Sequence, residues 1–233
     1  MIKHHPKFEL IQAFVNGDLP ASLSAGIAIH ADMCPKCKQQ IMQLTDEIAE
    51  TSFENTIDNN VEFTAFDSAE ISSNSDITPM NFDEMLNEIT QSDELFKAEP
   101  SVMKNISFKN KSYTLPSALN NMAIGNTLHL GKLSRARIQL NESEVHTSLL
   151  QIQPGGGVPQ HTHKGFELTL LLDGSFSDEE GEYVEGDFIM RDSSHKHQPV
   201  SEQGCLCYTV ANDALHFTQG INKLLNPIGT FIY

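Results

Sequence analysis

The sequence predicts an α+β protein of two parts, a small helical domain followed by an all-β barrel or sandwich. The first fifty residues repeat their apolar positions at helical spacing. From about Lys104 the chain instead alternates apolar and polar residues between glycine-rich turns. Each part also carries its own set of metal-ligand residue types. We therefore place a helical, zinc-binding domain at residues 1–90 and a metal-binding β domain at residues 91–233.

Three helices are expected in the first fifty residues. They are predicted between Pro6 and Gly17, from Pro20 through His30, and from Pro35 to about Glu50. Cys34 and Cys37 then lie at the start of the third helix, where the helix dipole favours a thiolate.

A polar segment separates the two domains. Residues 51–79 are rich in Ser, Thr, Asn and Asp, which indicates a linker or a loosely folded arm. One amphipathic helix is expected after it, because Phe82, Met85, Leu86 and Ile89 follow helical spacing. Such a short helix needs a surface on which to bury its apolar stripe, either on one of the two domains or on a partner protein.

Strands are expected in the second part of the chain. The stretches with strand character are SFKNKSYTLP, RARIQL, TSLLQIQ, FELTLLL and GCLCYTV. The turns expected between them are 154–157, Asp173-Gly174 and Glu185-Gly186-Asp187. Many short strands joined by glycine-rich turns are typical of a β-sandwich or barrel.

Charge and cysteine usage limit the function classes. The net charge is −16, of which residues 1–100 carry −13. Such a surface is unsuited to nucleic acid, so we expect a basic protein partner, or else an acidic segment that only keeps the chain soluble. The four cysteines form two close pairs, and the sequence has no apolar run of signal-peptide or membrane-spanning type. We therefore expect a cytoplasmic protein that binds neither nucleic acid nor a membrane.

The first set of ligand residues is His30, Cys34 and Cys37, with the spacing H-x3-C-x2-C. A Cys-x2-Cys pair is the usual way to place two thiolates on one zinc ion, and a structural zinc takes four ligands. The fourth must come from elsewhere, and His4 and His5 are the histidines available upstream.

This pattern resembles the zinc-binding anti-sigma domain, over roughly residues 1–90. The resemblance implies that His5 is the fourth ligand. It also implies a small helical bundle that wraps an extracytoplasmic-function sigma factor and blocks its binding to core RNA polymerase.

The second set of ligand residues lies in the segment GGGVPQHTHKGFELTLLLDG. His161 and His163 stand two apart on a predicted strand and so point to one face, and Glu167 follows on the next strand. The segment resembles the first cupin motif over its full length, which implies an all-β, jelly-roll-like barrel. The second cupin motif is only partly kept, because Val184 replaces its proline and its histidine comes late, as His195 or His197.

The two motifs in this order resemble the ChrR family, in which a zinc anti-sigma domain precedes a cupin-like metal domain. The resemblance implies that His197 closes the second site, which would hold zinc, iron or manganese. It implies release of the sigma factor on oxidative stress of the singlet-oxygen type. Cys205 and Cys207 share a strand face and form either a reactive pair or ordinary core residues, and we favour the core.

Three functions compete, of which the third is a storage or structural cupin. The first is an anti-sigma factor that regulates transcription without enzymatic activity. The second is a metal-dependent cupin dioxygenase with a zinc-stabilised appendage. The N-terminal zinc motif favours the regulator, because an enzyme gains nothing obvious from it. The small-molecule ligand, if there is one, is not indicated by the sequence.

Overall fold

The computed structural model describes residues 1–58, 82–91 and 103–217, apart from residues 110, 143, 164 and 213–215. The chain divides into two compact units. The first combines residues 1–48 with the chain from residue 103 onward, and the second comprises residues 49–102. The N-terminal helices therefore pack with the β part of the chain, and the domain boundary at residue 90 stays a prediction.

Four α-helices are described, and all four were expected, whereas a short 3-10 helix at Ser117–Leu119 was not. They are α1 (Phe8–Asn16), α2 (Ala21–Met33), α3 (Pro35–Asp58) and α4 (Phe82–Gln91). Gly17 ends α1 in the left-handed conformation, with φ of 77°, which glycine adopts at little cost. Pro35 occupies the first position of α3, where its missing N–H would have no helical partner in any case.

The prediction that α3 ends near Glu50 was wrong, because the helix continues to Asp58. The first eight residues of the predicted linker, TSFENTID, are thus helical. They contain neither glycine nor proline, so no residue stops the helix there. The rest of the predicted linker, residues 59–79, falls outside the described residues. In α4, Leu86 and Ile89 are 56% and 65% exposed.

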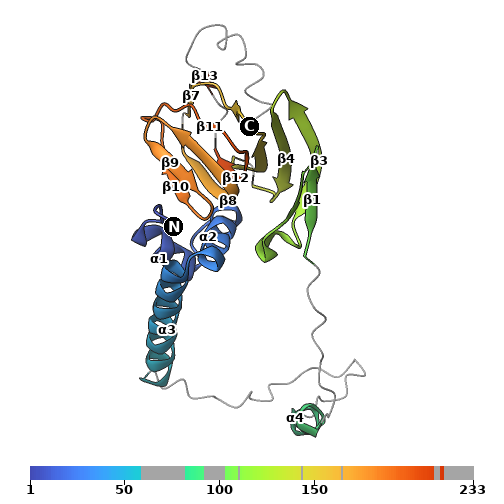
Figure 1. The fold of residues 1–233 in the computed structure, drawn as a ribbon. Coiled ribbons are helices and arrows are strands. Elements are labelled where there is room, and N and C mark those ends of the chain that lie inside the picture. Colours follow the sequence, from blue (N-terminus) through green and yellow to red (C-terminus); the bar gives the residue numbers. More distant parts are fainter. Residues whose placement is uncertain are drawn as a thin grey trace. The chain divides into compact units, whose positions relative to one another are not determined.

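The β part is one curled antiparallel sheet with two small additions (Figure 1). Its strands are β3 (Ala123–Leu130), β4 (Leu133–Gln139), β5 (His146–Ile152), β6 (Gly156–Gly157), β8 (Glu167–Asp178), β9 (Gly181–Val184), β10 (Phe188–Arg191), β11 (Val200–Ser201) and β12 (Cys205–Ala211). The order along the sheet is β3-β4-β5-β12-β8-β11-β6, and β9 and β10 also pair with β8. The additions are β1 (Asn105–Phe108) with β2 (Lys111–Thr114), and β7 (His161–Thr162) with β13 (His216–Phe217). This is the helical domain and cupin-like β fold that the sequence predicts.

One predicted turn is instead a bulge inside a strand. Asp173-Gly174 was expected to end the strand FELTLLL, but β8 runs on to Asp178. Its pairing with β12 shifts register there, because Cys207 pairs with Leu171 while Leu206 pairs with Asp173. Gly174, with φ of 80°, accommodates the irregularity without ending the strand.

Both faces of the central strands are buried, each in a different core. Alternate residues of a strand point to opposite faces of the sheet. In β8 and β12, Leu168, Leu170, Leu206, Tyr208 and Val210 belong to one buried cluster. Leu171, Cys205 and Cys207 belong to another. This arrangement explains why FELTLLL and GCLCYTV contain nearly continuous apolar runs.

Helix α2 covers one of these faces and shares its core. The buried cluster that contains Leu168 of β8 and Tyr208 of β12 also contains three residues of α2, which are Leu23, Ile27 and Ile29. A close approach is possible at Gly26, where an added Cβ would come within 2.7 Å of Leu168 Cδ2. The helix and the sheet are therefore one packing unit (Figure 1).

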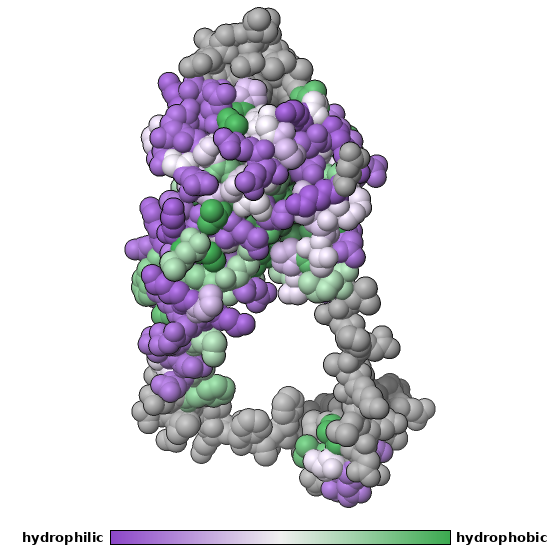
Figure 2. Space-filling view, viewed as in Figure 1, coloured by the Kyte–Doolittle hydropathy of each residue, from purple (hydrophilic) through white to green (hydrophobic). Residues whose placement is uncertain are grey.

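The surface of the N-terminal helices differs from that of the barrel. In Figure 2, apolar side chains gather over the helices where they meet the barrel, whereas the barrel surface above is mostly hydrophilic. Phe8 of α1 and Met42 of α3 are 49% and 57% exposed. Within the described ranges, no helix combines the length and the apolar composition needed to cross a membrane.

Candidate metal centres

The N-terminal ligand residues converge from three segments. His5 precedes α1, His30 lies in the last turn of α2, Cys34 lies between α2 and α3, and Cys37 lies in the first turn of α3. Cys34 N–H donates to the His30 carbonyl at 2.8 Å, which fixes the sharp passage between the two helices. The ligand atoms of the four residues all lie within 4.8 Å of one another. We call this set the N-terminal cluster.

The spacing of these atoms fits a tetrahedral ion. His5 Nδ1 and His30 Nε2 are 3.4 Å apart. The nitrogen–sulfur distances are 3.3 Å for His30 to Cys37 and 3.5 Å from His5 to each cysteine. A tetrahedron with the usual zinc–nitrogen and zinc–sulfur bond lengths has edges of about 3.3 Å between nitrogens and about 3.6 Å between nitrogen and sulfur. The donor set and its size therefore suit zinc.

Without a bound cation, burial determines the protonation states of the ligand residues in this cluster. Burial lowers the pKa of His30 and outweighs the opposing hydrogen bond to Gly186, so its imidazole is neutral and able to bind a metal. Burial and the neighbouring Cys34 raise the pKa of the Cys37 thiol to about 11. A buried thiol of this kind becomes a thiolate when a cation binds it, so metal binding would release protons.

The second set of residues converges inside the barrel. His161 lies in β7, His163 directly follows it, and Glu167 begins β8. His197 is brought to them by a β-bridge, in which the backbones of His161 and His197 exchange hydrogen bonds of 3.1 and 3.2 Å. The ligand atoms lie within 4.8 Å of one another. We call this set the barrel cluster.

The barrel cluster contains buried polar atoms that the protein does not satisfy. Glu167 Oε2 lies 3.0 Å from His163 Nε2 and 3.5 Å from His197 Nε2. Neither contact has hydrogen-bond geometry, and all three atoms are buried without a partner. Buried polar groups normally find partners, so lone pairs that face one another across a shared point fit a metal ion at that point.

The charges in the barrel cluster also suit a cation. Burial lowers the pKa of His161 to about 3, so its imidazole is neutral. Its Nδ1 lies 2.9 Å from the Pro159 carbonyl, which can only accept, and Nε2 is therefore free to bind a metal. Burial alone would raise the pKa of Glu167, but His163 and His197 outweigh it and hold the pKa well below its usual range.

A layer of residues behind His197 was not predicted from the sequence. Its Nδ1 faces Asp178 Oδ2 at 3.5 Å, and Arg191 Nη2 donates to the same oxygen at 2.6 Å. Arg191 also donates to the Tyr183 hydroxyl at 2.8 Å. Carboxylates placed behind metal-binding histidines orient the ring and raise its basicity. These residues belong to neither ligand motif, so only the fold identifies them.

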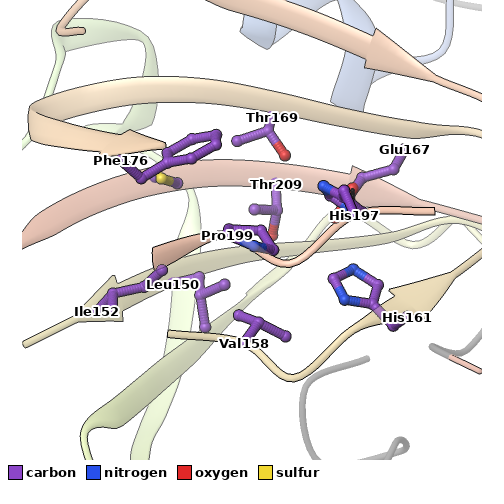
Figure 3. A pocket seen from close by; sticks show the side chains of 11 residues that line it. Leu150, Ile152, Val158, His161, Glu167, Thr169, Phe176, His197, Pro199 and Thr209 are labelled. Carbon is purple, nitrogen blue, oxygen red and sulfur yellow. Dashed lines mark ion pairs between the residues drawn. The ribbon is translucent and has the colours of Figure 1, made fainter. Parts of the chain in front are cut away.

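A small apolar cavity adjoins the barrel cluster. Figure 3 shows Glu167 and His197 at one end of it and Leu150, Ile152 and Phe176 at the other. Its volume is about 30 Å³, which is room for about two water molecules. The cavity therefore suits a small diatomic or triatomic molecule better than an organic substrate.

The structure distinguishes between the two histidines that could complete the barrel cluster. His197 lies in the barrel cluster, whereas His195 has a 40% exposed side chain and contacts Asp192 at 2.8 Å. The other cysteine pair lies in the core, as favoured from the sequence. Cys205 and Cys207 are buried, and their sulfur atoms are 4.0 Å apart.

Comparison with known proteins agrees with both parts of the chain. Residues 128–214 match the family described as the ChrR cupin-like domain. The anti-sigma-E factor ChrR of Cereibacter sphaeroides is 27% identical over 234 residues, which cover 97% of each protein. The crystal structure of Rhodobacter sphaeroides SigE in complex with the anti-sigma ChrR matches with a TM-score of 0.61 and 24% identity, covering 91% of this chain and 100% of that chain.

The family match covers the strands that carry the barrel cluster, and the structural match shows that the helical and β parts share one fold with the solved relative. The resemblance of this chain to the ChrR family, predicted from its two ligand motifs, is therefore confirmed.

Proposed function

We propose that this protein is an anti-sigma factor that sequesters an extracytoplasmic-function sigma factor and thereby regulates transcription. The observation that carries the proposal is similarity along 97% of the chain to a protein named an anti-sigma-E factor. A structure that shares the fold contains that kind of protein in complex with a sigma factor, SigE. The proposed partner of this chain is accordingly a sigma factor.

The charged and exposed apolar side chains of the N-terminal part support a protein partner. Residues 1–100 carry a net charge of −13, and a sigma factor needs basic surfaces for DNA and RNA polymerase. Phe8, Met42, Leu86 and Ile89 are all exposed apolar side chains on helices. Exposed apolar and acidic side chains of this kind, on whichever of the two units, suit contacts with a basic protein partner.

We further propose that the N-terminal cluster binds zinc and holds the helices in their binding conformation. Its four proposed ligands are His5, His30, Cys34 and Cys37, and their nitrogen and sulfur atoms have the spacing of a tetrahedral site. A zinc ion there would tie the N-terminal segment, α2 and α3 together, because each contributes at least one ligand.

The barrel cluster is proposed to bind a second metal through His161, His163, Glu167 and His197. Three imidazoles and a carboxylate suit zinc, iron or manganese alike, so the residues restrict the metal without selecting it. We propose that this site takes part in releasing the sigma factor on oxidative stress of the singlet-oxygen type. The small cavity beside it has room for a molecule as small as an oxidant.

A metal-dependent dioxygenase is the second candidate, because the barrel cluster opens onto an apolar cavity. Organic substrates need pockets of several hundred Å³, and this cavity of about 30 Å³ is far smaller. The size of the cavity therefore favours the regulator.

The deciding experiment uses the full chain and the extracytoplasmic-function sigma factors of its own genome. We expect one of them to form a stable complex in size-exclusion chromatography and to lose activity in a transcription assay when the protein is added. The double variant Leu86→Asp/Ile89→Asp should weaken this inhibition. The matched control is Leu128→Asp/Leu130→Asp, which places two acids at apolar positions of β3 that are each 43% exposed. If no such sigma factor binds, the proposed function is wrong.

A further inference from the structure

We propose that the N-terminal cluster is a composite site whose ligands are held in place by a turn of the barrel, Gly186-Asp187. Neither residue contacts a nitrogen or sulfur atom that would bind the metal. They are positioning residues, which orient His30 and the segment that carries His5. The inference concerns metal retention alone and is independent of any sigma factor.

The first contact orients the His30 ring. His30 Nδ1 lies 2.8 Å from the Gly186 carbonyl oxygen, and His30 is fully buried. A carbonyl oxygen only accepts, so Nδ1 carries the proton and Nε2 presents its lone pair to Cys37 and His5. The barrel thus supplies the hydrogen bond that selects the metal-binding tautomer of a helix residue 156 positions away.

The second set of contacts fixes the segment before His5. Asp187 is fully buried, and its Oδ1 accepts hydrogen bonds from the backbone N–H of Lys3 at 2.6 Å and of His4 at 2.9 Å. The Phe188 N–H donates to the His4 carbonyl at 3.0 Å. The residue directly before the ligand His5 is therefore bonded to the barrel through both its N–H and its carbonyl.

The same carboxylate also holds its own turn in shape. Asp187 Oδ2 accepts a hydrogen bond from the Val184 N–H at 2.9 Å, so both carboxylate oxygens are hydrogen-bonded. The turn requires Gly186 for two reasons, its φ of 90° and the contact it makes with Ile2, whose Cγ1 would lie 2.7 Å from an added Cβ. A buried carboxylate that accepts three N–H groups makes strong, charge-assisted bonds. The turn is consequently a rigid base for the ligands.

Loosening this attachment is expected to weaken metal retention. Partners of metal-binding side chains typically change metal affinity by about 10- to 100-fold when they are mutated. The effect at this site should be a faster loss of the ion, because the segment with His5 would separate more often from the other three ligands.

The test compares Lys3→Pro with Lys3→Ala in the full chain. The Lys3 side chain is exposed, so both variants lose the same side chain with little consequence. Only Lys3→Pro also removes the N–H that donates to Asp187. The probe is Co²⁺, because its thiolate charge-transfer absorption reports on the N-terminal cluster, whose ligands include cysteines, and not on the imidazole and carboxylate barrel cluster.

We expect Co²⁺ to pass from Lys3→Pro to an excess of chelator about tenfold faster than from Lys3→Ala, which should match the unmodified chain. Equal rates for the two variants would overturn the proposal. Asp187→Asn provides a second test, since an amide offers one acceptor oxygen where the carboxylate uses two. If it unfolds the barrel turn, the comparison at Lys3, which leaves the barrel sequence intact, still decides the question.

Discussion

The hydroxyl of Tyr208 donates a hydrogen bond of 2.8 Å to the carbonyl of Ser22, joining β12 to the first turn of α2. Both residues are fully buried. Ser22 N–H in turn donates to Glu142 at 3.0 Å, so the start of α2 is attached to the barrel from two directions. The helical segment and the β part consequently share a polar anchor as well as an apolar core.

This shared core predicts that Gly26→Val destabilises the whole unit. The new side chain would collide with Leu168, which is fully buried between α2 and the sheet. Overpacking of this kind costs about 1–3 kcal/mol. Thermal or urea unfolding followed by circular dichroism should show the loss. Ala28→Val, at a half-buried position of the same helix, is the control for a valine in α2, because it loses helix propensity relative to alanine whereas Gly26→Val gains it relative to glycine. Equal stability of the two variants would contradict the packing described for Gly26.

The N-terminal cluster predicts that Cys34→Ala removes one equivalent of zinc per chain. Three ligands would remain, and Cys37 would keep a pKa raised by burial, which disfavours its thiolate. Because metal binding and folding are coupled, we also expect lower helicity in α1 to α3. Elemental analysis and far-ultraviolet circular dichroism measure the two effects. Cys205→Ala, at a buried cysteine outside both clusters, should retain the metal.

Much of both clusters was predictable from the sequence because ligand spacing is a local property. H-x3-C-x2-C needs only a helix junction to bring His30, Cys34 and Cys37 together. His161 and His163 need only an extended segment, which β7 and the residue after it provide. The choice between His195 and His197 depends on a β-bridge to His161, which local spacing does not reveal.

The interactions behind the ligands were not predictable, since they join distant parts of the chain. Asp178, at the end of β8, contacts Arg191 in β10 and His197 in the segment before β11, and Asp187 accepts a hydrogen bond from Lys3 across 184 positions. The packing of α2 on the sheet was likewise not predictable from the sequence. Strands that are buried on both faces lose the alternation that would mark one face for a helix.

The interaction of Asp178 with His197 predicts that Asp178→Asn weakens metal binding in the barrel. The variant removes the negative charge that orients and supports the His197 ring and leaves the buried Arg191 with Glu180, 3.3 Å away, as its remaining charged partner. We expect about a 10- to 100-fold loss of affinity for the barrel metal. Competition titration against a chelator measures it. Asp192→Asn, which changes an exposed carboxylate, should leave the affinity unchanged.

The packing of α2 also bears on a fragment of residues 1–90. Without the barrel, the buried side chains Leu23, Ile27 and Ile29 would face water. We therefore expect the fragment to inhibit the sigma factor when the two are produced together, but to be less stable alone than the full chain. Transcription assays and thermal unfolding of the two forms provide the comparison. Inhibition by the full chain but not by the fragment would assign inhibition to the barrel.

The proposed sensing role predicts that His161→Ala and Glu167→Ala separate inhibition from release. Both residues belong to the barrel cluster, and neither lies on the exposed helical surface proposed for the sigma factor. The variants should therefore inhibit transcription as the unmodified protein does but retain the sigma factor during exposure to singlet oxygen. A reporter gene controlled by that sigma factor, measured in cells with and without the stress, gives both quantities.

His195→Ala is the matched control for these variants, since it removes a nearby histidine that lies outside the cluster. We expect this control to inhibit and release normally. Normal release by His161→Ala and Glu167→Ala as well would remove the barrel metal from the signalling path. A direct assay of oxygen consumption by the metal-loaded protein would then test the dioxygenase alternative, because the cluster adjoins an apolar cavity.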